Sequence, residues 1–249
     1  MSFLHKLGLN MGAGMTREIS RQVQFGARPL MPVASVPVIG TPRPPERKEF
    51  TRVSNGLKEL LWNLEGIGRG TLLDLGPAWQ TTITFFIERG FRVSSEDILR
   101  GWNAFASQED ARRQESTSNC QDIDFTASGK ASRFLSENLS YPLSSVDTVL
   151  LWDLLDYLEP TLARQVVARI MDIMRPGGVV FAMFHSKKPA AFQRYRVADS
   201  NVLQVVDTPV INPAQKVYQN REIQDLFGRY RTMKTFIGRD QLRETLFIK

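Results

Sequence analysis

Two carboxylates in the first half of the chain lie where a nucleotide-binding sheet would use them. Asp74 belongs to a short apolar run, 71–75, and Gly76 and Pro77 break the chain directly after it. Asp97 closes a second apolar run 23 positions beyond Asp74. In a parallel βαβ unit, the turn after the first strand presents backbone N–H groups, and an acid about 20 residues on accepts the ribose hydroxyls. These residues therefore predict a nucleotide site.

An alternation of strands and helices must position this site. Apolar runs predict buried strands at 71–75, 90–98, 146–150 and 179–184. Apolar residues at helical spacing predict helices at 46–65, 161–174 and 217–230. Segment 81–90 predicts a helix closed by a terminal glycine, and 102–115 is polar and helical in composition. Segment 187–208 is the least regular part, and the segments 233–237 and 244–248 predict a terminal hairpin. The alternation predicts a three-layer α/β fold around an open, mostly parallel sheet.

The position of a third strand has two solutions. We prefer 132–139, because the segment after it leads directly into the strand at 146–150. The rival is the short segment 122–125, which combines two acids with two apolar residues. Under the preferred placement, Glu137 and Asn138 lie at the carboxyl end of the strand, where open sheets bind their ligands.

The run from Leu72 to Gly76 resembles the opening signature of class I S-adenosylmethionine-dependent methyltransferases, an apolar strand that leads into acid-x-Gly-x-Gly-x-Gly. Asp74 and Gly76 fit that signature, whereas Ala78 and Gln80 replace its second and third glycines. The fourth strand of the family is similar to 146–150, with Asp147 after an apolar residue. The helix, Arg-Pro-Gly-Gly turn and strand between 161 and 184 resemble the next unit of the family.

This resemblance covers about residues 49–249 and implies a Rossmann-like methyltransferase domain. It implies a seven-stranded sheet with a C-terminal antiparallel hairpin, and S-adenosyl-L-methionine as the cofactor. The cofactor-binding residues that it implies are Asp74, Gly76, Pro77, Ala78, Asp97, Glu137, Asn138, Leu139, Leu151 and Trp152. The indole of Trp152 is equally well explained as a core aromatic. His185 is a candidate general base, although a histidine at a strand end is more often an ordinary loop residue.

The predicted activity is methyl transfer to an unidentified acceptor, either a small molecule or a macromolecule. Two alternatives stay open. Ala78 and Gln80 favour a scaffold that has lost catalysis and works as a binding module. The basic last third, residues 180–249, carries 12 Lys and Arg against six Asp and Glu, which would suit an RNA methyltransferase. No motif supports nucleic acid, and such charge is usually a solvated face.

Composition places further bounds on the chain. At 249 residues and 42% hydrophobic content it can form a full core, and no apolar run is long enough for a membrane helix. One cysteine excludes an internal disulfide and suits a cytoplasmic protein, and two histidines make a metal site improbable. Residues 1–45 hold six of the 13 prolines and predict a flexible basic arm, followed by one domain at 46–249.

Overall fold

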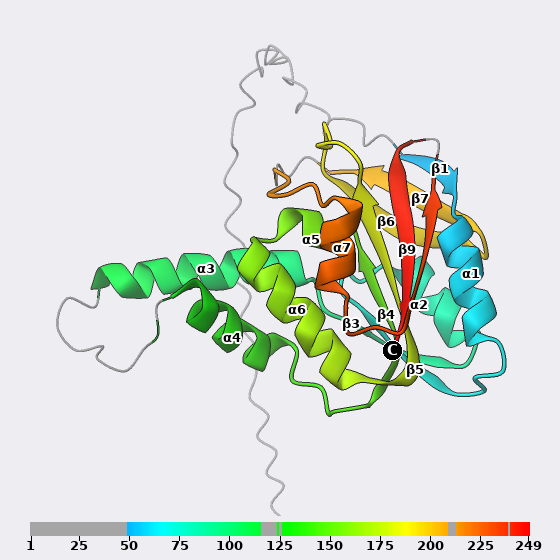
Figure 1. The fold of residues 1–249 in the computed structure, drawn as a ribbon, viewed down its shortest axis with the longest axis horizontal. Helices are drawn as coiled ribbons and strands as arrows, with labels where there is room; N and C mark the ends of the chain where they lie inside the picture. Colours follow the sequence, from blue (N-terminus) through cyan, green and yellow to red (C-terminus); the bar gives the residue numbers. More distant parts are fainter. Residues whose placement is uncertain (1–48, 116–123, 125, 209–212, 239) are drawn as a thin grey trace, which may run out of the picture. The chain divides into compact units, whose positions relative to one another are not determined.

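The computed structural model describes residues 49–115, 124, 126–208, 213–238 and 240–249. Its centre is a six-stranded sheet in the order β3-β2-β4-β5-β9-β8 (Figure 1). The strands of this sheet are β2 (Gly70–Asp74), β3 (Phe91–Ser95), β4 (Val146–Trp152), β5 (Met174–His185), β8 (Thr232–Ile237) and β9 (Leu242–Ile248). Strands β3, β2, β4 and β5 are parallel neighbours, whereas β9 is antiparallel to both β5 and β8.

This arrangement confirms the α/β fold, the mostly parallel sheet and the terminal hairpin. The predicted count of seven strands was too high for the described residues, because no third strand of the expected kind occurs in them. Segment 132–139, the preferred third strand, lies instead in helix α4 (Ala127–Asn138) and its C-cap Leu139. Buried Ala131, Phe134 and Leu135 lie at helical spacing, and the helix begins where the Thr126 hydroxyl accepts the Gly129 amide at 3.1 Å. The rival segment, 122–125, lies outside the described residues except for residue 124.

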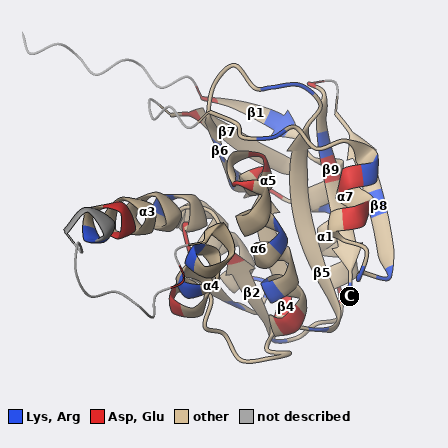
Figure 2. Ribbon diagram, turned by 60° about the vertical axis from the view of Figure 1, so that its left-hand side comes forward, with Lys and Arg blue, Asp and Glu red and all other residues tan. Residues whose placement is uncertain are grey.

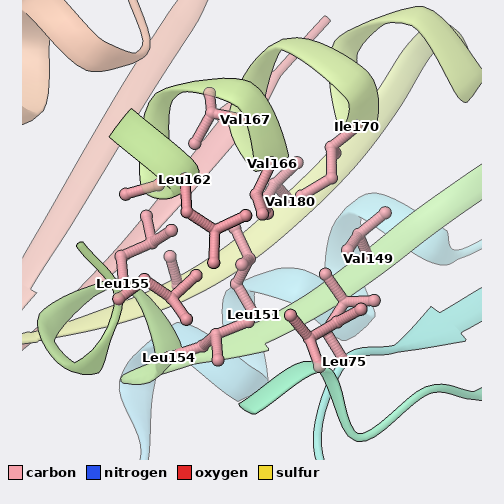
Figure 3. Packing of buried hydrophobic residues seen from close by; sticks show 14 of the residues in the cluster. Leu75, Val149, Leu151, Leu154, Leu155, Leu162, Val166, Val167, Ile170 and Val180 are labelled. Atoms are coloured by element: carbon pink, nitrogen blue, oxygen red, sulfur yellow. The ribbon is translucent and has the colours of Figure 1, made fainter. Parts of the chain in front are cut away.

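Two layers cover the sheet, one on each face. Helices on one face are α3 (Ile98–Glu115), α4, α5 (Leu154–Tyr157), α6 (Pro160–Ile173) and α7 (Asn220–Leu226). Helices on the other face are α1 (Asn55–Leu64) and α2 (Gln80–Ile87). Side chains of β4 alternate between the faces, because Val149 and Leu151 belong to the first core cluster and Leu150 and Trp152 to the second. Figure 3 shows the first of these clusters, where α6 packs across β4 and β5.

A second, three-stranded antiparallel sheet was not predicted. It consists of β1 (Glu49–Val53), β7 (Val202–Asp207) and β6 (Gln193–Asp199), with β7 in the middle. The predicted helix 46–65 was therefore wrong over residues 49–53, which form β1, and the helix begins after Ser54, whose hydroxyl accepts the Leu57 amide. Segment 187–208 was judged irregular but contains the whole β6–β7 hairpin, whose inward residues Tyr195 and Val197 join the second core cluster.

Candidate active site

Three parallel strands end side by side and bring the predicted nucleotide site together. Strand β2 ends at Asp74, β3 ends two residues before Asp97, and β4 ends at Trp152. The loop after β2 is hydrogen-bonded to β4, because the Leu75 amide donates to the carbonyl of Leu150 at 2.9 Å. The Glu96 amide likewise donates to the carbonyl of Asp74 at 2.8 Å. Carboxyl ends of adjacent parallel strands are where open α/β sheets bind ligands.

Asp74 is completely buried beneath this edge. Its Oδ1 accepts hydrogen bonds from Trp152 Nε1 at 2.7 Å and from the Gly76 amide at 2.9 Å. Its Oδ2 is buried without a hydrogen-bond partner among the described residues. Burial raises the pKa of Asp74 to about 6, against the opposing effect of those two hydrogen bonds. Asp74 is therefore a positioning group for the turn and for Trp152.

Trp152 covers the glycine turn. Its φ of 51° lies in the left-handed region, which is unusual for so bulky a residue. A Cβ on Gly76 would lie 2.9 Å from both Cδ1 and Nε1 of the indole, so only glycine allows this contact. The indole also stacks on Tyr195 of β6, with ring centroids 6.1 Å apart and planes 12° apart. Trp152 thus belongs to the second core cluster and also forms a wall of the site.

Asp97 lies at the mouth of the site and already has two partners. Its Oδ1 accepts the Arg100 amide of α3 at 3.2 Å. The guanidinium of Arg194 lies across the carboxylate, with Nη2 3.4 Å from Oδ2 and 3.5 Å from Oδ1. Arg194 belongs to β6, so a strand that was not predicted places a cation beside Asp97, the acid predicted to bind the ribose.

The space between these groups is small. We name it the cradle; it is a cavity of about 20 Å³ whose lining includes Gly76, Pro77, Leu151, Trp152 and Arg194. That volume suits about one water molecule, whereas cofactor sites usually measure about 300 Å³ or more. The cradle therefore contains the side chains expected for a nucleoside cofactor, but β6 fills the room that such a cofactor needs.

The predicted site residues divide into two groups. Gly76, Pro77, Leu151 and Trp152 line the cradle, and Asp74 and Asp97 lie beside it. Ala78 follows in the same turn but is not among the lining residues. The other three predicted residues lie outside the cradle lining, at the end of α4: Glu137 is exposed, the Asn138 amide donates to Phe134 within the helix, and Leu139 is buried in the first core cluster.

His185, at the end of β5, forms a dyad with a buried acid. Its Nδ1 lies 3.0 Å from Asp156 Oδ2, and its backbone amide donates to the same oxygen at 2.8 Å. Asp156 is buried in the short helix α5, directly after β4. Its own pKa is raised by burial, although the hydrogen bonds from His185 oppose that shift. Because a carboxylate accepts at Nδ1, the neutral imidazole carries its proton there and leaves Nε2 as an acceptor.

A second acid lies on the other side of the imidazole. Asp153 Oδ2 is 3.9 Å from His185 Nε2 and accepts a 3.3 Å hydrogen bond from the Tyr195 hydroxyl. Burial raises the pKa of Asp153 to about 7, partly offset by the charge of His185. Burial lowers the pKa of His185, but Asp156, Asp153 and Asp240 outweigh it and the net pKa is raised. Asp153 therefore exchanges its proton near neutral pH, and Asp156 and His185 keep theirs to a higher pH than usual.

An open cleft gives access to His185. It has a volume of about 310 Å³, and its lining includes His185, Arg52, Tyr195, Asp207 and Asp240. Gln193 and Tyr195 line both this cleft and the cradle, so the first residues of β6 separate the two. The sequence indicated His185 alone; Asp156 could have been found from its spacing of three after Asp153, which places both acids on one helical turn.

Two negative findings concern only the described ranges. No cluster of His, Cys, Asp and Glu there is arranged to hold a metal ion. None of the helices in those ranges has the length and apolar character that crossing a bilayer requires.

Comparison with known proteins gives distant similarities only. No protein-family model matches the chain, and no curated protein is significantly similar in sequence. Among solved structures, the chain is similar to an S-adenosylmethionine-dependent methyltransferase from Archaeoglobus fulgidus, with 12% identity, 78% of this chain and 91% of that chain covered, and a TM-score of 0.47. It is also similar to a putative type 11 methyltransferase from Sulfolobus solfataricus, with 15% identity, coverages of 76% and 89%, and a TM-score of 0.42.

A third similar structure was solved with ligands. It is the 1,6-didemethyltoxoflavin-N1-methyltransferase of Burkholderia thailandensis with 1,6-didemethyltoxoflavin and S-adenosylhomocysteine bound. Identity is 14%, the match covers 79% of each chain, and the TM-score is 0.39. These values are too low to carry an argument about activity. The strand order and the antiparallel final pair of the chain itself give it a methyltransferase-like α/β fold.

Proposed function

We propose that this protein is an S-adenosylmethionine-dependent methyltransferase. The observation that carries the proposal is that Asp97, the Gly76 turn and Trp152 lie at the carboxyl ends of three adjacent strands. Asp97 is the group that would accept the two ribose hydroxyls. When bound, the cofactor supplies a methyl group that its sulfonium has already activated, so the protein has mainly to orient the acceptor and exclude water.

The turn after β2 offers fewer free backbone N–H donors than its sequence suggests. The Gly76 amide already donates to Asp74, and Pro77 has no amide hydrogen. Ala78 is then the residue of this turn whose amide would meet the carboxylate end of the cofactor, near the N-terminus of α2. Leu151 and Trp152 would form the apolar wall.

Room for the cofactor requires Arg194 to leave Asp97. Both side chains keep about one fifth of their surface exposed, and the contact is 3.4 Å long. The pair is partly buried, but its contact is longer than the about 2.7–2.9 Å of a strong charge-assisted hydrogen bond, so hydrogen bonds from a ribose can replace it. The residues therefore fit the cofactor chemically once the start of β6 moves.

The small cradle also favours a second candidate, a methyltransferase-like scaffold that binds a partner without catalysis. Its supporting observation is the volume of about 20 Å³ together with the cation already on Asp97. A role on RNA gains less support, because five of the eleven Lys and Arg that the structure describes in residues 180–249 form ion pairs with acids: Arg194, Arg196, Lys216, Arg229 and Lys234. Figure 2 shows both charge signs along the ribbon, for example on α7.

Calorimetric titration of S-adenosylmethionine into the full chain separates the two candidates. The enzyme proposal expects saturable binding that Asp97→Asn weakens about tenfold or more, equivalent to about 1.4 kcal/mol. Asp110→Asn, at an exposed carboxylate on α3, is the matched control and should bind like the wild type. Absence of binding at millimolar cofactor, both in the wild type and in Arg194→Ala, would leave the scaffold candidate.

A further inference from the structure

The open cleft beside the cradle has the features of a second ligand site. His185 is one of its lining residues and has 15% of its side chain exposed, so a ligand in the cleft can reach the imidazole. The lining also contains Tyr195 and Gln193, which line the cradle as well. A molecule in the cleft is therefore separated from the cradle only by the start of β6.

The imidazole is held in one orientation and one tautomer. Asp156 Oδ2 bonds both the ring Nδ1 and the backbone amide of His185, which fixes the ring against the end of β5. Asp156 is fully buried, so this contact is shielded from water. Nε2 has no hydrogen-bond partner among the described residues within 3.5 Å, and the Asp153 carboxylate lies 3.9 Å away.

We propose that this cleft binds a small uncharged molecule with a hydroxyl or N–H group, and that Nε2 of His185 accepts the proton of that group. The electron pair of the O–H or N–H bond stays on the ligand heteroatom, which becomes the methyl acceptor. The role in methyl transfer rests on the function proposed above, whereas binding in the cleft can be tested without it. Asp156 is a positioning residue in this scheme, because it acts only through the imidazole.

The charges around the cleft favour an uncharged ligand. Two carboxylates, Asp207 and Asp240, line it, and Asp153 and Asp156 lie behind His185. Arg52 is the only Lys or Arg among the lining residues that the structure describes. Its guanidinium is already bonded to Asp240 at 2.9 Å and to Glu244 at 2.5 Å. A carboxylate or phosphate ligand would thus meet the carboxylates of Asp207 and Asp240 without a free cation.

The size and the walls of the cleft point to a molecule of one or two rings. A volume of about 310 Å³ is at the lower end of the range for small-molecule sites, about 300–1,000 Å³. The apolar part of the lining consists of Phe50, Pro189, Ala190, Ala191, Val205 and Leu242. Aromatic and aliphatic contacts of this kind suit a ring whose polar group faces His185.

Imidazole NMR of the full chain tests the proposal without cofactor. The chain has only two histidines, so His185→Gln assigns both signals. We expect phenol to shift the His185 signal saturably at millimolar concentration, and benzoate, its anionic counterpart, to leave it unchanged. Ala190→Trp, at an exposed position of the cleft wall, should abolish the phenol effect. No saturable shift with phenol, or an equal shift with benzoate, overturns the proposal.

The tautomer gives a second, independent measurement. The nitrogen shifts of neutral His185 in the wild type should show a proton on Nδ1, and Asp156→Asn should lose that preference. A wild-type proton on Nε2 would overturn the assignment of the acceptor atom, even if the variant failed to fold. Failure here is distinguishable from failure of the proposed function: normal S-adenosylmethionine binding without a phenol effect overturns this inference alone. A phenol effect without cofactor binding overturns the methyltransferase assignment and leaves the ligand site in place.

Discussion

The guanidinium of Arg194 lies 3.4 Å from the carboxylate of Asp97, at the position where a nucleotide-binding sheet presents an acid to a ribose. The same guanidinium lies over the ring of Phe192, 4.7 Å from its centroid. Arg194 therefore lines the cradle from β6 and pairs with the partly exposed carboxylate at its mouth. In the function proposed above, Arg194 would compete with the cofactor for the carboxylate of Asp97.

Removal of that cation should strengthen cofactor binding. Arg194→Ala frees Asp97 and enlarges the cradle, and release of an ion pair worth up to about 1 kcal/mol corresponds to roughly fivefold tighter binding. Calorimetry with S-adenosylhomocysteine measures the change. Arg196→Gln is the matched control, because Arg196 is on the same strand but pairs with Glu49. Weaker binding by Arg194→Ala than by the control would show that Arg194 holds the cofactor instead of excluding it.

The Asp74–Trp152 hydrogen bond should contribute to stability in a pH-dependent way. Trp152→Phe keeps an aromatic ring over Gly76 but removes the N–H that donates to Asp74 at 2.7 Å. Loss of a buried bond to a carboxylate costs about 1.5–3 kcal/mol, so urea unfolding at pH 8 should show a decrease of that size. At pH 5 the decrease should be smaller, because Asp74, with a pKa of about 6, is then mostly protonated. Trp62→Phe, at a side chain 71% exposed on α1, should change little at either pH.

Stability as a whole should fall as the pH rises from about 5 to 8. The pKa values of Asp74 and Asp153 are raised to about 6 and about 7, and those of Asp156 and His185 are also raised. A raised pKa means that the folded state binds the proton more tightly than the unfolded state. Stability from each carboxyl is therefore complete below its unfolded pKa of about 4 and is lost as the pH passes the folded value.

Urea unfolding at several pH values measures this slope. Arg194, Arg243 and the two acids around His185 act on the same groups, so these titrations are coupled and the slope belongs to the buried groups together. Asp153→Asn should flatten the slope between pH 5 and 8, whereas Asp110→Asn, at an exposed acid, should not. A stability that increases with pH across this window would contradict the buried, proton-binding state of these acids.

The sequence predicted the parts of the molecule that local patterns determine. Buried strands such as β4 and β5 are continuous apolar runs, and α6 has a clear helical period, so their residues alone identify them. Helix α4 was mistaken for a strand because its apolar residues are few and its other positions carry small polar side chains. The β6–β7 hairpin was missed although Arg194 and Arg196 alternate with the inward residues Tyr195 and Val197, which is the pattern of a half-buried strand.

The candidate site was predicted only where it depends on the ends of strands. Asp97 and Gly76 follow from their spacing after two strands, and His185 from its place at the end of β5. The contacts from β6 are long-range: Arg194 meets Asp97, 97 positions away, and Tyr195 meets Asp153, 42 positions away. Pairing at such separations depends on the packing of the hairpin against α2, which no local pattern specifies. The closure of the cradle was therefore beyond the sequence.

Close packing at the start of α1 gives the last prediction. A Cβ on Gly56 would lie 2.6 Å from Cε2 of Phe181 in the sheet and 2.8 Å from Cβ of Glu244. The Gly56 amide also donates to Glu244 Oε2 at 2.6 Å, so the helix cannot shift away without loss of that hydrogen bond. Gly56→Ala should therefore lower the free energy of unfolding by about 1–3 kcal/mol, despite the better helix propensity of alanine.

Gly68→Ala is the control for this substitution, because a Cβ there would meet nothing within 4 Å. Its unfolding free energy should stay within about 0.5 kcal/mol of the wild type. Chemical denaturation of both variants at one pH makes the comparison. Equal stability of the two would mean that α1 adjusts its position over β5 and β9, and that Glu244 does not fix the start of the helix. The expected result is a loss of stability confined to Gly56→Ala. In the double variant that also carries Phe181→Leu, part of this loss should be reversed, because leucine lacks the ring atom nearest to the added methyl group. That result would locate the strain between α1 and the sheet.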